Sequence, residues 1–395
     1  MTAETPARPR PVPATVLPTS RRWPRLAAYG AVFGAAGLAL LLPTSTAGAA
    51  WYFAGQLLDA EDNRPHPIRI REVTDGRVRL TRTDDLLRPM PLGLAWPGGH
   101  ARLGDVVDVD RTTVVREVVH VSRGVLRPGV RAYSSGKVFD GDPRSARGLG
   151  YSEILIPGEL GDLAAWFVPA TGLPRDTWII AVHGWKSSRE DALRVLPVLA
   201  ASGMPTLVVS YRNDAGAPAS ADRCHHLGHT EWSDVAAAVR YARTHGARDV
   251  VLYGWSMGGA IVLNLLRRAE EAKDVRAVVL DSPVIDWAET LRMHARTLRL
   301  PRAWLSTALW LVQHRLGVRL DDLDHRRYAA DLRVPTLVFL DRDDRVVATA
   351  PTREFAARRP DLVTILETES CGHCHFWNRA PERYETALSD FLGSL

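Results

Sequence analysis

A serine at the centre of a G-x-S-x-G pentapeptide, residues 254–258, constrains this chain more than any other feature. Residues 249–253 before it, mostly apolar, have the composition of a short buried strand, and residues 260–266 after it have that of a helix. Glycine suits this pentapeptide because a strand and a helix joined by so tight a turn pass close together. The pattern predicts a sharp strand-to-helix turn that exposes the hydroxyl of Ser256 at the edge of a sheet.

Short apolar segments alternate with segments of helical length from residue 151 onward. Such an alternation predicts an α/β fold, a mostly parallel central sheet with helices on both faces. The predicted strands are 151–156, 165–168, 178–182, 206–210, 250–253, 277–280, 336–340 and 364–367. An insertion at about 287–333 contains the apolar stretch 303–312, which predicts a helical lid over the serine. An additional core helix is the alternative.

A serine hydroxyl becomes a good nucleophile only when a general base removes its proton and an acid orients that base. After a turn of the predicted kind, the acid is expected behind one later strand and a histidine behind the next. Strand 336–340 runs into an acidic loop, and the next strand is followed by His373, directly after a glycine. Asp343 and Asp344 are both candidates for the acid, whereas Asp341 is expected to end the strand.

Residues from about 150 to 395 resemble the α/β-hydrolase fold family. The segments that carry the resemblance are 182–185, 254–259, 341–347 and 371–373. A more specific likeness is to actinobacterial serine hydrolases of undefined substrate, from the serine-peptidase-like and acyl-hydrolase branches. Segments similar to 210–214, 226–232 and 281–283 recur in that group.

The resemblance implies a Ser-His-Asp triad. Ser256 is similar to the family's nucleophile and His373 to its general base. Asp344 is similar to the orienting acid, because it stands three residues before Val347, where relatives commonly place that residue. Asp343, one residue away, stays a competitor for this role.

The resemblance also implies an oxyanion hole formed by the backbone N–H groups of Met257 and Trp185. The expected reaction is acyl transfer to the serine and hydrolysis of the acyl-enzyme, with no obligatory cofactor. An apolar lid and a membrane location favour an ester or acyl substrate. A serine aminopeptidase-like amide hydrolase is the alternative, in which Glu231 or Asp214 would hold the free amine.

Cysteines around the proposed base open a different interpretation. Cys371 and Cys374 flank His373 with a spacing that suits zinc, and a histidine from 225–229 would complete the ligand set. The chain would then be a non-catalytic, metal-binding protein on a hydrolase scaffold. Since a metal there would compete with the base, we expect no metal site. A disulfide from Cys224 to one of the two thiols, or three buried thiols, are the remaining alternatives.

The N-terminal third divides into three expected segments. Residues 1–25 are expected to form a disordered cytoplasmic N-terminus. Residues 26–55 contain no charged residue, which predicts a transmembrane signal anchor in the cell membrane with the catalytic domain outside the cytoplasm. A cleaved secretory signal with small residues at 47–49, and hence a secreted protein, is the alternative.

Residues 56–147 alternate apolar and polar side chains over short segments, with the hairpin signal Asp75-Gly76 between two of them. This pattern predicts a small β-rich accessory module ahead of a catalytic domain at 148–395.

The 395-residue chain has a net charge of +5, carried by arginines scattered among aspartate and glutamate. The sequence shows no basic stripe with interleaved aromatic residues, which argues against nucleic-acid binding. The expected partners are therefore a small-molecule ester, acyl or amide substrate and, through the N-terminal helix, a membrane. The sequence predicts no oligomeric state.

Overall fold

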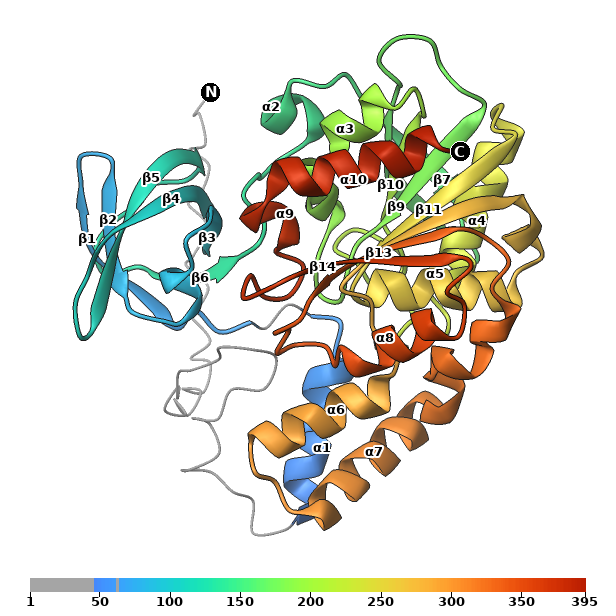
Figure 1. The fold of residues 1–395 in the computed structure, drawn as a ribbon. Helices are drawn as coiled ribbons and strands as arrows, with labels where there is room; N and C mark the ends of the chain where they lie inside the picture. Colours follow the sequence, from blue (N-terminus) through green and yellow to red (C-terminus); the bar gives the residue numbers. More distant parts are fainter. Residues whose placement is uncertain (1–45, 62–63) are drawn as a thin grey trace, which may run out of the picture.

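The computed structural model describes residues 46–61 and 64–395. It contains a small barrel, a larger α/β unit and a layer of helices at one end of the sheet (Figure 1). The N-terminal segment 1–25 and most of the predicted anchor 26–55 lie outside the described residues.

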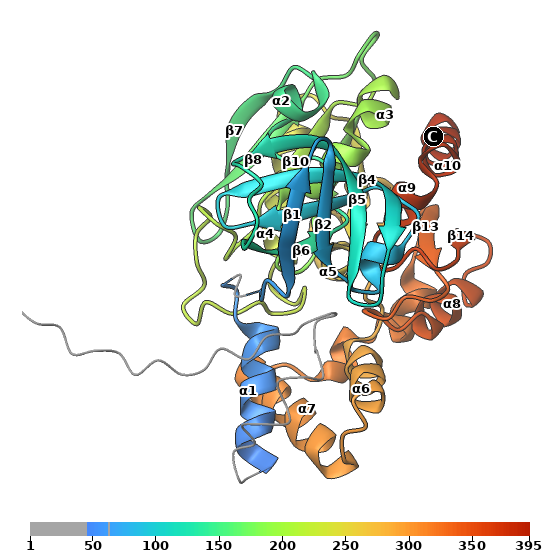
Figure 2. The same ribbon diagram turned by 90° about the vertical axis from the view of Figure 1, so that its left-hand side faces the viewer.

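Six antiparallel strands close the barrel in the order β1-β2-β5-β4-β3-β6 (Figure 2). They are β1 (Ile68–Thr74), β2 (Arg77–Thr81), β3 (Leu92–Trp96), β4 (Gly99–Val109), β5 (Thr113–Arg123) and β6 (Arg131–Ser135). The predicted hairpin joins β1 to β2, and Gly76 in its turn has a φ of +67°. Alternate residues such as Ile70 and Leu80 are fully buried inside the barrel. The predicted β-rich module is therefore confirmed as a barrel.

An eight-stranded sheet forms the centre of the larger unit, in the order β14-β13-β12-β11-β9-β10-β8-β7. The strands are β7 (Ser152–Pro157), β8 (Asp162–Val168), β9 (Thr177–Val182), β10 (Thr206–Val209), β11 (Asp249–Trp255), β12 (Val275–Asp281), β13 (Thr336–Asp341) and β14 (Val363–Thr368). From β10 to β14 neighbouring strands are parallel, and β8 is antiparallel to both β10 and β7. The predicted α/β architecture is confirmed.

Helices cover both faces of this sheet, as its apolar strands require. They are α2 (Pro143–Arg147), α3 (Leu196–Ala201), α4 (Trp232–Thr244), α5 (Met257–Arg268), α8 (Ala350–Ala357), α9 (Phe376–Arg379) and α10 (Pro381–Gly393). In β9, Ile180 faces the core with α4 and α5, whereas Ile179 faces the core with α3 and α10. That second core also includes the apolar interior of the barrel.

The helical layer consists of α1 (Thr46–Leu58), α6 (Trp287–Thr297) and α7 (Arg302–Leu316) (Figure 1). α6 and α7 belong to the insertion predicted as a lid. Leu57 of α1 is buried, and the ring of Phe53 lies edge-on to Trp304 of α7 at 5.1 Å. Within the described ranges, every helix is too short or too polar to cross a membrane. The described end of the predicted anchor thus lies in a 13-residue helix that packs on α7, and the prediction of a membrane span is not supported in this described part.

Candidate active site

The turn at Ser256 has the strained geometry expected of an exposed nucleophile. Ser256 has φ +51° and ψ −115°, a combination that side-chain-bearing residues rarely adopt. A Cβ at Gly258 would lie 2.2 Å from the carbonyl oxygen of Val182, and a Cβ at Gly254 would lie 2.6 Å from the α5 backbone. The Ser256 N–H donates to the carbonyl of Asp281 at 2.9 Å, which ties the turn to the end of β12.

Two hydrogen bonds connect Ser256 to His373 and then to Asp344. The Nε2 atom of His373 lies 2.8 Å from Ser256 Oγ, and its Nδ1 atom lies 2.6 Å from Asp344 Oδ2. The other oxygen, Asp344 Oδ1, accepts the backbone N–H groups of Val346 at 2.7 Å and Val347 at 3.0 Å. The carboxylate is thereby fixed in the orientation that places a proton on Nδ1 and leaves Nε2 free to accept from serine.

Charge and burial act in opposite directions on this pair. Burial alone would raise the pKa of Asp344, but the facing imidazole of His373 holds it below its usual value. Burial alone would likewise lower the pKa of His373, but the Asp344 carboxylate raises it well above its usual value. The other titratable groups that interact electrostatically with His373 are Cys374, Asp281, His294 and His375.

The neighbouring carboxylates serve the loop that carries the imidazole. Asp343 Oδ2 accepts the N–H of Ser370 at 3.2 Å and its hydroxyl at 2.9 Å. Asp341 accepts the N–H of Gly372. Asp344, rather than Asp343, therefore occupies the place beside the imidazole.

The two segments predicted to supply the oxyanion hole both pass close to the serine. Met257 opens α5, where the first N–H groups have no acceptor inside the helix. A Cβ at Gly184 would lie 3.1 Å from Ser256 Cβ, so the backbone that leads into Trp185 passes close to this serine. The Trp185 indole N–H donates to the carbonyl of Leu57 at 2.9 Å, which fixes this loop against α1.

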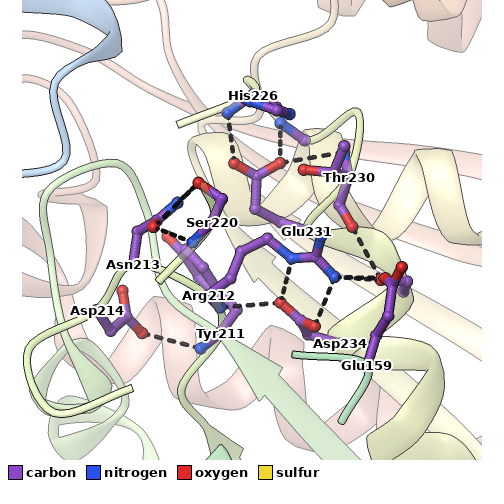
Figure 3. A network of polar contacts seen from close by, with 12 residues as sticks. Glu159, Tyr211, Arg212, Asn213, Asp214, Ser220, His226, Thr230, Glu231 and Asp234 are labelled. Carbon is purple, nitrogen blue, oxygen red and sulfur yellow. Dashed lines mark hydrogen bonds and ion pairs between the residues drawn. The ribbon is translucent and has the colours of Figure 1, made fainter. Parts of the chain in front are cut away.

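The two carboxylates considered for binding an amine are engaged within the fold (Figure 3). Asp214 Oδ2 accepts from the backbone N–H of Tyr211 at 2.9 Å and lies 2.7 Å from Nε2 of His183. The fully buried Glu231 accepts the N–H groups of His226 at 2.7 Å and of Gly228 at 3.0 Å. Both side chains stabilise loops, which removes them as candidates for recognising a substrate amine.

Arg212 completes this network. Its structural role was not predicted from the sequence. Its Nε donates to Asp234 Oδ2 at 2.8 Å, and its Nη2 donates to Glu159 Oε2 at 3.0 Å (Figure 3). The pair with Asp234 is almost completely buried, so it anchors the segment after β10 to α4.

All three cysteines are free thiols. Cys224 lies near Arg315 of α7, whereas Cys371 and Cys374 lie in the loop after β14. The predicted disulfide alternative is therefore wrong, because the partners belong to different parts of the fold. Among the residues that the structure describes, no three histidine, cysteine or carboxylate side chains are arranged to hold a metal ion.

One apolar pocket adjoins the serine, and a second apolar pocket shares part of its lining. One has an empty volume of about 360 Å³ and is lined by Leu57, Trp185, Ser256, Val284, Trp287, Thr290, Leu291, His294, Val346 and Val347. The second, of about 430 Å³, lies among α1, α6 and α7. Leu57, Leu291 and His294 line both pockets. The pocket beside Ser256 and the pocket in the helical layer are therefore neighbours.

Residues 179–387, more than half of the chain, match the model of the alpha/beta hydrolase family. The chain belongs to this family. Residues 69–135, which cover the barrel, match a domain of unknown function. An uncharacterised protein of Escherichia coli strain K12, YfhR, is 24% identical over 159 residues, 40% of this chain and 54% of that protein. The chain thus spans about half the length of this curated relative.

Solved structures with a similar fold include an esterase from Pyrococcus furiosus, with a TM-score of 0.51 and 20% identity. The similarity covers 65% of this chain and 96% of that esterase. A puromycin-hydrolysing peptidase from Mycobacterium tuberculosis has a TM-score of 0.50 and 18% identity, over 82% of this chain and 54% of the peptidase. At these identities the likeness establishes only the α/β-hydrolase fold.

Proposed function

We propose that this member of the alpha/beta hydrolase family is a serine hydrolase that cleaves carboxylic esters through an acyl-enzyme. Ser256 is the nucleophile, His373 the general base and Asp344 the acid that orients it. The observation that carries the proposal is the pair of hydrogen bonds, 2.8 Å and 2.6 Å long, that runs from the serine hydroxyl through the imidazole to the carboxylate.

In the first half-reaction, Nε2 of His373 takes the proton of Ser256 as Oγ attacks the carbonyl carbon of the ester. The N–H groups of Met257 and Trp185 stabilise the negative oxygen of the tetrahedral intermediate. The ester bond then breaks, and His373 gives its proton to the departing alcohol. In the second half-reaction, His373 takes a proton from water, the hydroxide attacks the acyl carbon, and the carboxylic acid leaves as Ser256 regains its proton.

An apolar acyl group fits the pocket beside the serine better than a charged peptide terminus. The side chains that line this pocket are mostly apolar, and its titratable member, His294, donates Nε2–H to the carbonyl of Val346 at 2.9 Å. Burial lowers the pKa of His294, so the ring stays uncharged at neutral pH. Among the residues that the structure describes, the lining includes no carboxylate that would bind a free amine, which favours an ester over an aminopeptidase substrate. In this proposal α6 and α7 act as the lid.

The proposal is tested by labelling the full chain with a fluorophosphonate probe and by hydrolysis of p-nitrophenyl butyrate. The parent is expected to react with both, and Ser256→Ala with neither. Ser306→Ala, which changes an exposed serine on α7, is the matched control and should behave as the parent. A folded parent that neither takes up the probe nor cleaves the ester contradicts the proposal.

We also propose that the catalytic domain is exported, because the sequence carries a long uncharged stretch that begins at Leu26. Protease treatment of intact cells, compared with lysed cells, tests this location. A domain that protease degrades only after lysis, and that antibody does not reach on intact cells, would contradict this location.

A further inference from the structure

The loop between β14 and α9 carries His373 in an unfavourable backbone conformation. Ser370 and Cys374 both have a φ of +55°, and Gly372 has a φ of +91°. Left-handed conformations of residues with a side chain persist only where the surrounding structure holds them in several ways. The position of the imidazole therefore depends on the contacts that the loop makes with its neighbours.

One side of the loop is held by the sheet. Asp343, which follows β13, accepts the N–H and the hydroxyl of Ser370. Ser282, which follows β12, accepts the N–H of Cys374 at 3.2 Å. These contacts fix the loop on both sides of His373, through residues of the hydrolase domain.

The other side is held by the barrel, through Asn378. This residue of α9 is 2% exposed, and its amide nitrogen donates to the carbonyl of Pro91 at 2.9 Å and to that of Gly136 at 3.0 Å. Pro91 directly precedes β3, and Gly136 directly follows β6. Both acceptors thus belong to the barrel, while the donor stands five positions after the proposed general base. Since a buried amide left without acceptors is costly, these bonds tie α9 to the barrel.

Arg194 connects Asn378 to the histidine loop. Its Nη1 donates to Asn378 Oδ1 at 3.1 Å and to the carbonyl oxygen of Cys374 at 2.5 Å. Burial alone would lower the pKa of Arg194, but the Asp191 carboxylate raises it, so the guanidinium stays charged. Hydrogen bonds from a charged donor are stronger than neutral ones. The backbone beside His373 is therefore coupled to the amide that the barrel binds.

A turn of the barrel also packs directly on the loop. A Cβ at Gly136 would lie 2.4 Å from Cδ2 of the half-buried His375 ring. The turn is itself held inside the barrel, because His100 bonds the carbonyl of Lys137 through Nε2 at 2.9 Å and the hydroxyl of Ser122 through Nδ1 at 2.7 Å. A well-fixed glycine therefore forms the surface against which the histidine loop rests.

We propose that the barrel is a positioning module for the catalytic histidine. It holds the loop of His373 through Asn378, Arg194 and the packing surface at Gly136, so that the imidazole reaches Ser256 and the carboxylate partner together. The proposal assigns a role to a domain of unknown function, and it rests on the proposed serine-hydrolase function. None of its three residues touches the substrate; each acts through the position of His373.

Two single substitutions test it from opposite sides of the interface. Gly136→Ala places a methyl group against the His375 ring without changing any residue of the hydrolase domain. Asn378→Asp keeps an oxygen for Arg194 but replaces the two donated hydrogens with a carboxylate that faces carbonyl oxygens. Gly150→Ala is the matched control, because a Cβ there meets no atom within 4 Å and the backbone is not left-handed.

We expect Gly136→Ala and Asn378→Asp to lower kcat for p-nitrophenyl butyrate on the order of 100-fold, with KM nearly unchanged, since a displacement of about 1 Å at the base has that effect. The pH profile gives a second readout. The Asp344 carboxylate raises the pKa of His373, so a loosened loop lets that pKa fall and moves the acid limb of kcat/KM to lower pH. Gly150→Ala should keep both the parent's kcat and its profile.

A purely structural interface predicts a different result. If Gly136→Ala and Asn378→Asp melt at lower temperature but keep the parent's kcat and pH profile while folded, the positioning role is overturned. Should one variant fail to fold, the other decides alone. A parent that shows no esterase activity and no fluorophosphonate labelling refutes the proposed function instead, so the two failures are distinguishable.

Discussion

Asp344→Asn provides the sharpest test of the proposed triad, because the change preserves shape and removes one charge. In the parent, Asp344 Oδ2 lies 2.6 Å from Nδ1 of His373 and selects the tautomer that leaves Nε2 free to accept the serine proton. An asparagine amide directed at Nδ1 donates instead of accepting, which places the imidazole proton on Nε2. The general base is then absent from most molecules. We expect kcat to fall by on the order of 10⁴-fold, or about 5.4 kcal/mol of transition-state stabilisation.

The assay is ester hydrolysis by the full chain across a range of pH, with Asp343→Asn as the control. Asp343 is adjacent, but its carboxylate bonds to Ser370, so we expect its loss to change kcat far less. Equal losses in both variants, or full activity of Asp344→Asn, would refute the reasoning. The acid limb of any residual activity should also move to lower pH, because the carboxylate that raises the pKa of His373 is gone.

Three further predictions follow from packing and burial. Gly258→Ala should lower the free energy of unfolding by roughly 3 kcal/mol, because the added methyl group would lie 2.2 Å from a carbonyl oxygen. Denaturant titration measures this change, and a variant as stable as the parent contradicts the prediction. Leu291→Trp, which narrows both pockets, should reduce kcat/KM for p-nitrophenyl octanoate on the order of tenfold relative to the acetate ester; an unchanged ratio argues against acyl binding there. Burial lowers the pKa of His325 from 6.5 to about 3, so the unfolded chain takes up the proton first as the pH falls. Between these two pH values the free energy of unfolding should fall by about 1.4 kcal/mol per pH unit. In His325→Phe, urea titrations at several pH values should show a weaker dependence of this free energy on pH.

The sequence alone indicates those parts of the candidate site that depend on local order along the chain. Ser256, Asp344 and His373 each follow an apolar strand, and parallel strands bring their carboxyl ends to one edge of the sheet. Spacing alone did not distinguish Asp343 from Asp344. In the structure the Asp343 carboxylate accepts from Ser370, whereas the Asp344 carboxylate faces the imidazole of His373.

Contacts between distant segments were not predictable from a single sequence. Arg194 and Asn378 are 184 positions apart, and nothing in the residues around either one indicates that they meet. The assignment of 26–55 to a membrane anchor failed at its described end for a similar reason. An uncharged helix such as α1 is compatible both with lipid and with an apolar protein surface, and here it packs on α7.

The segments that precede the matched hydrolase region contact both loops on which the proposed chemistry depends. On one side, α1 accepts hydrogen bonds from the loop after β9: the carbonyl of Leu57 accepts from the Trp185 indole, and the carbonyl of Gln56 accepts from the Lys186 ammonium group at 3.3 Å. On the other side, two backbone carbonyl groups of the barrel accept hydrogen bonds from the Asn378 amide. A hydrolase domain cut from the chain at residue 148 would lose both supports at once. Its sheet would still contain the turn at Ser256, yet the loops that carry His373 and Trp185 would lack the partners that hold them, so we expect activity to require the chain from α1 onward.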